Sequence, residues 1–279
     1  LIKYSEFPLD EVKDYGFDYT PAQPDRQHPF LLFTQADVGR VRRQAKTIPS
    51  VQTEFARVND YLNRCGGDNL VKKIEQQPDG WKAFYRENYV GNGLYEVVPT
   101  GYLASDEKKF GIMLAAAVKG FAGEAMDIFL ETPTRACIGG YGPWFSWNWL
   151  RLLHAYDAIA DSGYLTVDDK KYIEAVLVFG SHFQAHADYW NTERGLCSAN
   201  PNMTSMIRLP LGLMALFQDG HPLSVRWLVA AEQELQHELK EWVAPGGAWT
   251  ENPGYQAASL DGMLQIGRAS CRERVYHPV

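Results

Sequence analysis

Residues 221–243, HPLSVRWLVAAEQELQHELKEWV, carry the pattern that decides the fold. Apolar residues recur there at helical spacing with charged residues between them, at Trp227, Leu228, Leu235, Leu239 and Trp242. Such spacing gathers the apolar side chains on one face of a helix, which then covers a core. Similar periodicity precedes this stretch at 203–218 and follows it at 255–265, so a series of packed helices is predicted.

The link between the last two helices, residues 244–254, has the composition of a shaped loop. It holds three glycines and two prolines, which interrupt helices and favour turns. It also carries Trp249 and Glu251, and Tyr255 falls at the start of the next helix. Large functional side chains are unusual in a simple turn, so we expect the chemistry of the protein here.

The remaining chain repeats the helical pattern without alternating strand signals after residue 103. Thr34 and Asp37 form a predicted capping box. Helices are expected after Thr34 and at 50–64, 105–130 (a pair broken around Gly120–Gly123), 150–159, 168–190, 203–218 and 222–243. Two aromatic loops are expected at 78–102 and 138–149. The fold class predicted is all-α, an incomplete (α/α) toroid of antiparallel helix hairpins.

Three regions are expected along the chain. Residues 1–27 are proline-punctuated and predict an extended arm that lies on the body, and residues 28–265 form the toroid domain. Residues 266–279 add charges without a periodic face and resemble translated adapter sequence. We therefore expect this tail to be irregular and poorly packed, with a genuine basic tail as the alternative.

Composition limits the function classes. Among 279 residues, 46% are hydrophobic and 22% are charged, as in ordinary globular proteins. The net charge of -7 argues against a nucleic-acid partner. No run of 18 apolar residues occurs, so no membrane span is predicted. The four cysteines lack metal-ligand spacing, and His182 and His186 are expected to be ordinary histidines rather than metal ligands.

Three segments together resemble heparinase II/III-like and alginate-lyase-like polysaccharide lyases. They are HPFLLFTQADVGRVRRQA at 28–45, SANPN at 198–202 and GAWTENPGY at 247–255. The resemblance implies a toroid enzyme that cleaves an anionic, uronic-acid-containing polysaccharide by β-elimination, without metal or cofactor. It also implies a secreted or periplasmic bacterial protein. The family often has histidine where this chain has Met203 and Gln256.

The resemblance assigns the chemistry to Asn202 and Tyr255. Pro201 suits the first helical position and Asn200 the cap, which leaves the Asn202 amide to stabilise the anion that develops on the substrate. Tyr255 is the candidate base. A phenolate needs a cationic neighbour, for which three candidates remain open, namely Arg194, Arg208 and His154. Two alternatives remain open. Asn200 and Asn202 could both serve only as cap residues of the helix, and Tyr255 could be a buried core residue.

Further substrate contacts are expected around this pair. Asn200 and the two arginines would touch the substrate, and Glu251 would orient Tyr255 or an arginine, or cap the next helix. At least one of Trp144, Trp147 and Trp149 is expected to stack on a sugar ring, and Trp249 is expected to contact the substrate.

Two other functions fit the same sequence. An inverting glycoside hydrolase would pair Glu251 with Asp157 or Asp161 across a cleft. A non-catalytic glycan-binding protein would keep the tryptophans without needing Asn202 or Tyr255.

Overall fold

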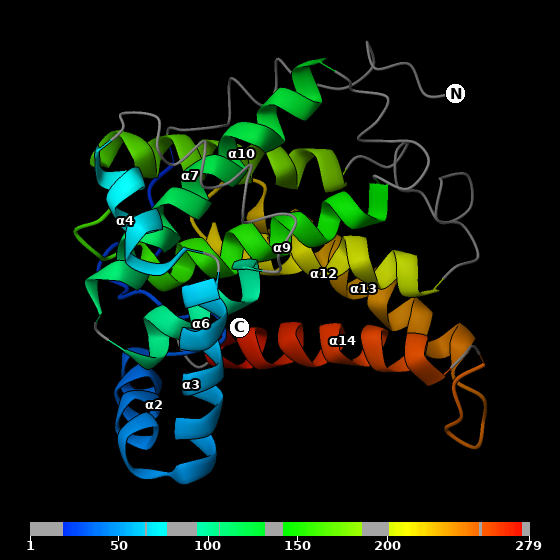
Figure 1. Ribbon diagram of the computed structural model, residues 1–279. Coiled ribbons are helices and arrows are strands. Elements are labelled where there is room, and N and C mark those ends of the chain that lie inside the picture. The colour runs from blue at the N-terminus through cyan, green and yellow to red at the C-terminus, as the bar shows by residue number, and fades with distance from the viewer. Residues whose placement is uncertain are drawn as a thin grey trace. The chain divides into compact units, whose positions relative to one another are not determined.

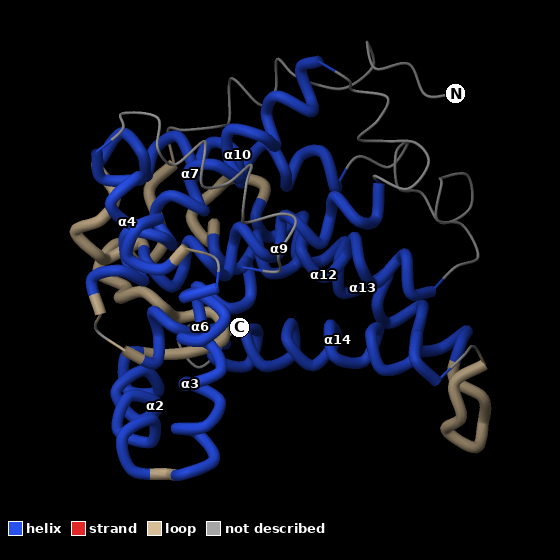
Figure 2. The backbone as a smooth tube through the Cα atoms, viewed as in Figure 1, coloured by secondary structure: helices blue, strands red, loops and turns tan. Residues whose placement is uncertain are grey.

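The structure is a computed structural model that describes residues 19–64, 66–76, 94–105, 107–131, 142–185, 201–250 and 253–274. These residues form helices joined by loops (Figures 1 and 2). The helices are α2 (Gln35–Thr47), α3 (Pro49–Arg64), α4 (Gly67–Gln76), α6 (Leu94–Ala104), α7 (Lys108–Glu131), α9 (Gly142–Ile159), α10 (Val167–Ala185), α12 (Pro201–Phe217), α13 (Ser224–Trp242) and α14 (Pro253–Arg274). Within these ranges, β pairing is limited to one isolated bridge, between Val243 and Trp249. The prediction of an all-α fold is confirmed.

The chain divides into two compact units, and three of the helices pass from one to the other. The first unit takes its residues from Leu1–Asp25, Asp127–Leu150 and Glu174–Val279. The second takes them from Arg26–Met126 and Arg151–Ile173. No described helix is long and apolar enough to cross a membrane.

The second unit begins with an extended segment that leads into α2. Phe30 and Leu31 are buried there. Thr34 caps α2: its hydroxyl accepts from the Asp37 backbone N–H, and the Asp37 carboxylate accepts from the Thr34 N–H, so the predicted capping box is confirmed. Helices α2 and α3 pack against each other and against α6.

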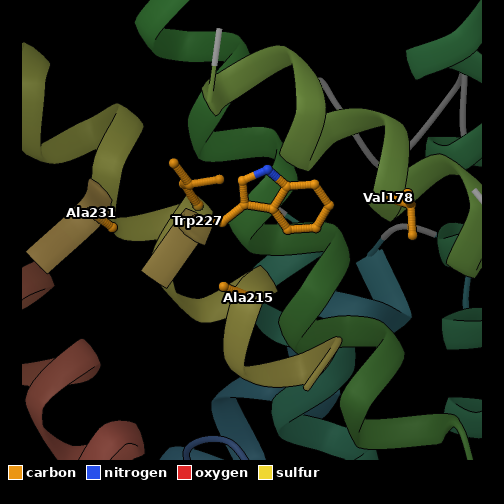
Figure 3. Close-up of a cluster of buried hydrophobic side chains, with 5 residues drawn as sticks. Val178, Ala215, Trp227 and Ala231 are labelled. Atoms are coloured by element: carbon orange, nitrogen blue, oxygen red, sulfur yellow. The ribbon is translucent and has the colours of Figure 1, made fainter. Parts of the chain in front are cut away.

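The first unit is built around the hairpin of α12 and α13. Its hydrophobic cluster joins Val178 of α10 to residues of both hairpin helices, Leu211, Ala215, Trp227 and Ala231. Figure 3 shows the Trp227 indole at the centre of this cluster, and only 2% of this residue is exposed. The stretch 221–243 therefore forms a helix with Trp227 and Leu235 on its buried face, as the spacing predicts, whereas Leu239, which the same spacing places on that face, is 40% exposed.

The segment before this core, at the start of the described chain, lies against the turn that joins α12 to α13. The Ala22 N–H donates to the Asp219 carboxylate, with a nitrogen–oxygen distance of 3.0 Å. A Cβ atom added to Gly220 would lie 1.8 Å from the Thr20 carbonyl oxygen, so only glycine permits this approach. The predicted arm thus packs on the body over residues 19–22, while residues 1–18 of that prediction lie outside the described chain.

Three predicted loops or breaks are helical instead. Helix α7 runs without a break through Gly120–Gly123, since glycine within a helix costs only about 1 kcal/mol and small residues allow close packing. Helix α6 begins at Leu94, inside the loop expected at 78–102. Helix α9 begins at Gly142, so the second aromatic loop is largely the first turns of a helix.

The expectation of an irregular tail is wrong for residues 266–274, and the expectation of poor packing is wrong at Ile266 and Ala269. Helix α14 continues to Arg274, and Ile266 and Ala269 are 5% and 1% exposed. A Cβ atom at Gly212 of α12 would come within 2.7 Å of Ile266 Cδ1, which shows that α14 packs closely there. Residues 275–279 lie outside the described chain.

Candidate active site

Two helices of the first unit begin with the segments that carry the family resemblance. Pro201 is the first residue of α12 and Asn202 the second, so the helix start predicted at Pro201 is confirmed. Pro253 opens α14, and Tyr255 is its third residue. The first turn of a helix has backbone N–H groups without helical partners and the positive end of the helix dipole. Both positions therefore lie where an anion is stabilised.

Helices α12 and α14 run parallel. A Cβ atom at Gly262 of α14 would lie 2.8 Å from Leu209 Cδ2 of α12, and Gly212 of α12 meets Ile266 of α14. The residue numbers of these two pairs differ by 53 and 54. Figure 1 shows both helices starting at the same side. The numbers of Asn202 and Tyr255 also differ by 53, which sets their backbones at the same level of the two helices.

Helix α13 lies antiparallel to α12, as three cross-helix contacts show. The Ser205 hydroxyl donates to Glu238 Oε2 over 2.7 Å, and both residues are buried. Arg208 Nη2 lies 3.9 Å from Glu234 Oε1, and a Cβ atom at Gly212 would lie 3.3 Å from Ala231 Cβ. The last turn of α13 therefore reaches the level at which α12 begins.

The Arg208 side chain lies among the packed helices rather than on the protein surface. Only 6% of the residue is exposed, and its Nη1 donates to the Gln184 backbone carbonyl of α10 over 3.0 Å. The nearby Glu234 carboxylate also offsets its charge. We therefore correct the expectation that Arg208 binds substrate, because its guanidinium already joins α10, α12 and α13.

The turn that follows α13 folds back as a short hairpin. Val243 pairs with Trp249, the Ala244 N–H donates to the Ala248 carbonyl, and Thr250 donates to the Trp242 carbonyl through both its N–H and its hydroxyl. Gly247 adopts a φ of 81°, which explains the glycine at this turn. The sequence thus predicted the position of the loop, but not that backbone hydrogen bonds join its two ends.

The two tryptophans of this hairpin differ in exposure. Trp249 is 8% exposed, so its expected role as a substrate contact is corrected to one of core packing. Trp242, at the end of α13, is half-buried. In the sequence, Trp242 is the last member of the apolar spacing of 221–243. That spacing alone does not show where the buried face of the helix ends.

Buried imidazoles form a second feature of the first unit. His182 and His221 meet edge to face with ring centroids 6.0 Å apart, and the His221 ring stacks on Trp227 at 4.6 Å. Burial, followed by the nearby His221, lowers the pKa of His182 to about 4. Among the described residues, no group of histidine, cysteine or carboxylate side chains could hold a metal ion. His182 is a core histidine, and His186 lies outside the described chain.

Tyr19 packs on the same cluster and is chemically inert as a base. Its ring meets His221 edge to face, with centroids 5.4 Å apart. Burial raises the pKa of the Tyr19 phenol far above its usual value, and the Glu174 and Asp219 carboxylates raise it further. Tyr19 therefore stays protonated at any physiological pH.

In the second unit, Asp157 anchors the extended segment before α2. Its carboxylate accepts the backbone N–H groups of Phe30 and Leu31 and contacts His28 Nδ1 at 2.8 Å. Asp161, one turn later, accepts the His28 N–H. With both Asp157 oxygens engaged and only 3% of the residue exposed, the Asp157 version of the hydrolase pair is not supported.

The structure describes the side chains of some of the remaining predicted residues but not of others. Trp149 of α9 is fully buried against Gly180 of α10, so it is a core residue and not a sugar platform. His154 is half-buried on the part of α9 that belongs to the second unit. The backbones of Trp144 and Trp147 lie in α9. Their side chains lie outside the described parts, as do those of Asn202 and Tyr255, and the whole of Asn200, Arg194 and Glu251.

Comparison with known proteins gives this chain no family. No protein-family model matches the sequence, and no curated protein matches it.

Proposed function

We propose that the protein is a polysaccharide lyase that cleaves a uronic-acid-containing polysaccharide by β-elimination, on an incomplete α/α toroid. The observation that supports this most directly is the parallel packing of α12 and α14. It sets the backbones of Asn202 and Tyr255 at one end of two neighbouring helices, although the two residues are far apart in sequence. The antiparallel α12–α13 hairpin is the unit from which such a toroid is built.

The chemistry needs stabilisation of negative charge and a base. Elimination removes the proton at C5 of the uronate and expels the oxygen at C4, and negative charge develops on the carboxylate side of the ring. In the proposal, the Asn202 amide and the backbone N–H groups of the first turn of α12 receive this charge. Because the protein has a net charge of -7, it repels an anionic polymer overall, and binding such a polymer requires these local donors.

Tyr255 takes the role of base and acid in this proposal. At the two positions where the family often has histidine, this chain has Met203 and Gln256, so the phenol is the one matched residue able to transfer a proton. One phenol serves both steps only if the C5 proton and the C4 oxygen lie on the same face of the ring. This holds for D-glucuronate and D-mannuronate, which favours β-linked polymers such as glucuronan or mannuronate-rich alginate.

A product assay tests the proposal. Elimination leaves a conjugated double bond that absorbs ultraviolet light, hydrolysis leaves a reducing end without that absorption, and a binding protein leaves the polymer intact. We expect ultraviolet-absorbing products from polyglucuronate or polymannuronate, and little from polyguluronate. Release of reducing ends without absorption would favour the hydrolase.

Two variants address the residues. Tyr255→Phe should remove nearly all turnover while leaving polymer binding, and Asn202→Ala should lower kcat by about 10²–10³, the usual effect of losing one such donor. Tyr172, a tyrosine that is 48% exposed on α10, offers a matched control, and Tyr172→Phe should keep full activity. Substantial turnover by Tyr255→Phe would show that another residue is the base, with His154 the next candidate.

A further inference from the structure

Trp242 closes the buried stripe of α13. The buried positions of this helix include Trp227, Ala231, Leu235 and Glu238, at steps of three or four residues. The next step of four is Trp242, the last residue of the helix. Unlike the members before it, Trp242 is only half-buried. The stripe that faces α12 thus ends on a large aromatic side chain that is partly open to solvent.

The cross-helix contacts locate this residue. Glu238 of α13 bonds Ser205, the fifth residue of α12. Because the two helices are antiparallel, one further turn along α13 corresponds to one turn back along α12. Trp242 therefore lies at the level of Pro201 and Asn202, and Tyr255 of α14 shares this level through the parallel packing of α12 and α14.

The backbone of Trp242 is held in place by the hairpin that follows it. Its carbonyl accepts the Thr250 N–H over 3.0 Å and the Thr250 hydroxyl over 3.1 Å. Trp249, buried at 8% exposure, ties the returning strand of the hairpin to the body. A rigid indole costs little conformational entropy when it binds a ligand, which is why tryptophan dominates many binding sites.

We propose that Trp242 is the sugar-stacking residue of this site, and that its indole receives the apolar face of a pyranose ring next to the position where the uronate reacts. This inference rests on the lyase proposed above, since the same end of α12 and α14 supplies the polar contacts. A pyranose offers C–H groups on one face and hydroxyl groups at its rim, so an aromatic plate beside hydrogen-bond donors suits it.

Binding measurements with defined oligosaccharides test the role of Trp242. The ligands are tetrasaccharides of β-linked D-glucuronate, of β-linked D-mannuronate and of β-linked glucose, titrated by calorimetry into wild type, Trp242→Ala and Trp242→Phe. We expect at least one tetrasaccharide to bind, about tenfold or more weaker binding by Trp242→Ala, and partial recovery by Trp242→Phe. Leu239→Ala, at a 40% exposed position earlier on the same helix, should bind like wild type.

The outcomes separate this inference from the proposed function. Unchanged affinity in a folded Trp242→Ala, checked by its urea midpoint, would overturn the inference, as would absence of binding by wild type to all three ligands. Equal weakening in Leu239→Ala would also overturn it, because the effect would then belong to the helix as a whole. If binding depends on Trp242 but no ultraviolet-absorbing product forms from any polymer, the stacking role stands and the lyase proposal fails.

Discussion

Acidification should destabilise the first unit through His182. The ring is 5% exposed and lies against His221 and Trp227, and the pKa of His182 falls from 6.5 to about 4 in the folded protein. A histidine whose pKa is lower when folded binds more protons when unfolded. Its contribution to stability is therefore complete above pH 6.5 and is lost as the pH falls from 6.5 towards 4.

The size of this effect follows from the two pKa values. Between pH 7 and pH 5 the folded protein leaves His182 neutral, while the unfolded chain becomes almost fully protonated there. Linkage then gives a loss of about 2 kcal/mol in the free energy of unfolding over this range. His221 faces His182 within the cluster, and Tyr19 with its neighbours Glu174 and Asp219 lies beside it.

A matched variant isolates the contribution of His182. His182→Phe keeps an aromatic edge against Trp227 but has no proton to gain. Urea unfolding of both proteins from pH 7 to pH 5 should show the wild type losing about 2 kcal/mol more than the variant. Parallel pH profiles for the two proteins would refute the reasoning, because they would mean that His182 titrates alike in both states.

Three further predictions concern packing. Gly220→Ala should displace the Thr20 segment, since the added methyl group would lie 1.8 Å from the Thr20 oxygen; faster proteolysis near residue 20 would show this, and wild-type protection would contradict it. Asp157→Ala leaves the buried Phe30 N–H without its acceptor, and urea unfolding should record a loss of about 2–4 kcal/mol, where a loss below 1 kcal/mol would contradict the anchoring role. Glu238→Leu, which removes the carboxylate that accepts from the Ser205 hydroxyl, should cost about 1–3 kcal/mol by the same measurement, and an unchanged midpoint would contradict a stabilising role for this hydrogen bond.

Local sequence patterns predicted the elements of the fold well where the cause is local. The capping box at Thr34, the helix start at Pro201 and the amphipathic spacing of 221–243 each depend on neighbouring residues, and each appears as expected. The same patterns failed at Gly120–Gly123, where glycines predicted a break that the continuous α7 does not have. Small residues weaken a helix only slightly, and close packing outweighs that cost.

The candidate site depends on information that no local pattern contains. The sequence singles out Asn202 and Tyr255, but only the contacts of Gly212 and Gly262 show that α12 and α14 run parallel and share a level. Exposure is likewise a tertiary property. The sequence does not distinguish Trp149, Trp242 and Trp249 by exposure, yet Trp149 and Trp249 are buried and Trp242 is only half-buried. The amino-acid sequence by itself determined the caps and the amphipathic faces of several helices, because capping and backbone hydrogen bonding are local. Only tertiary packing decided which helix faces met and which aromatic ring stayed partly exposed, because burial depends on residues distant in the chain.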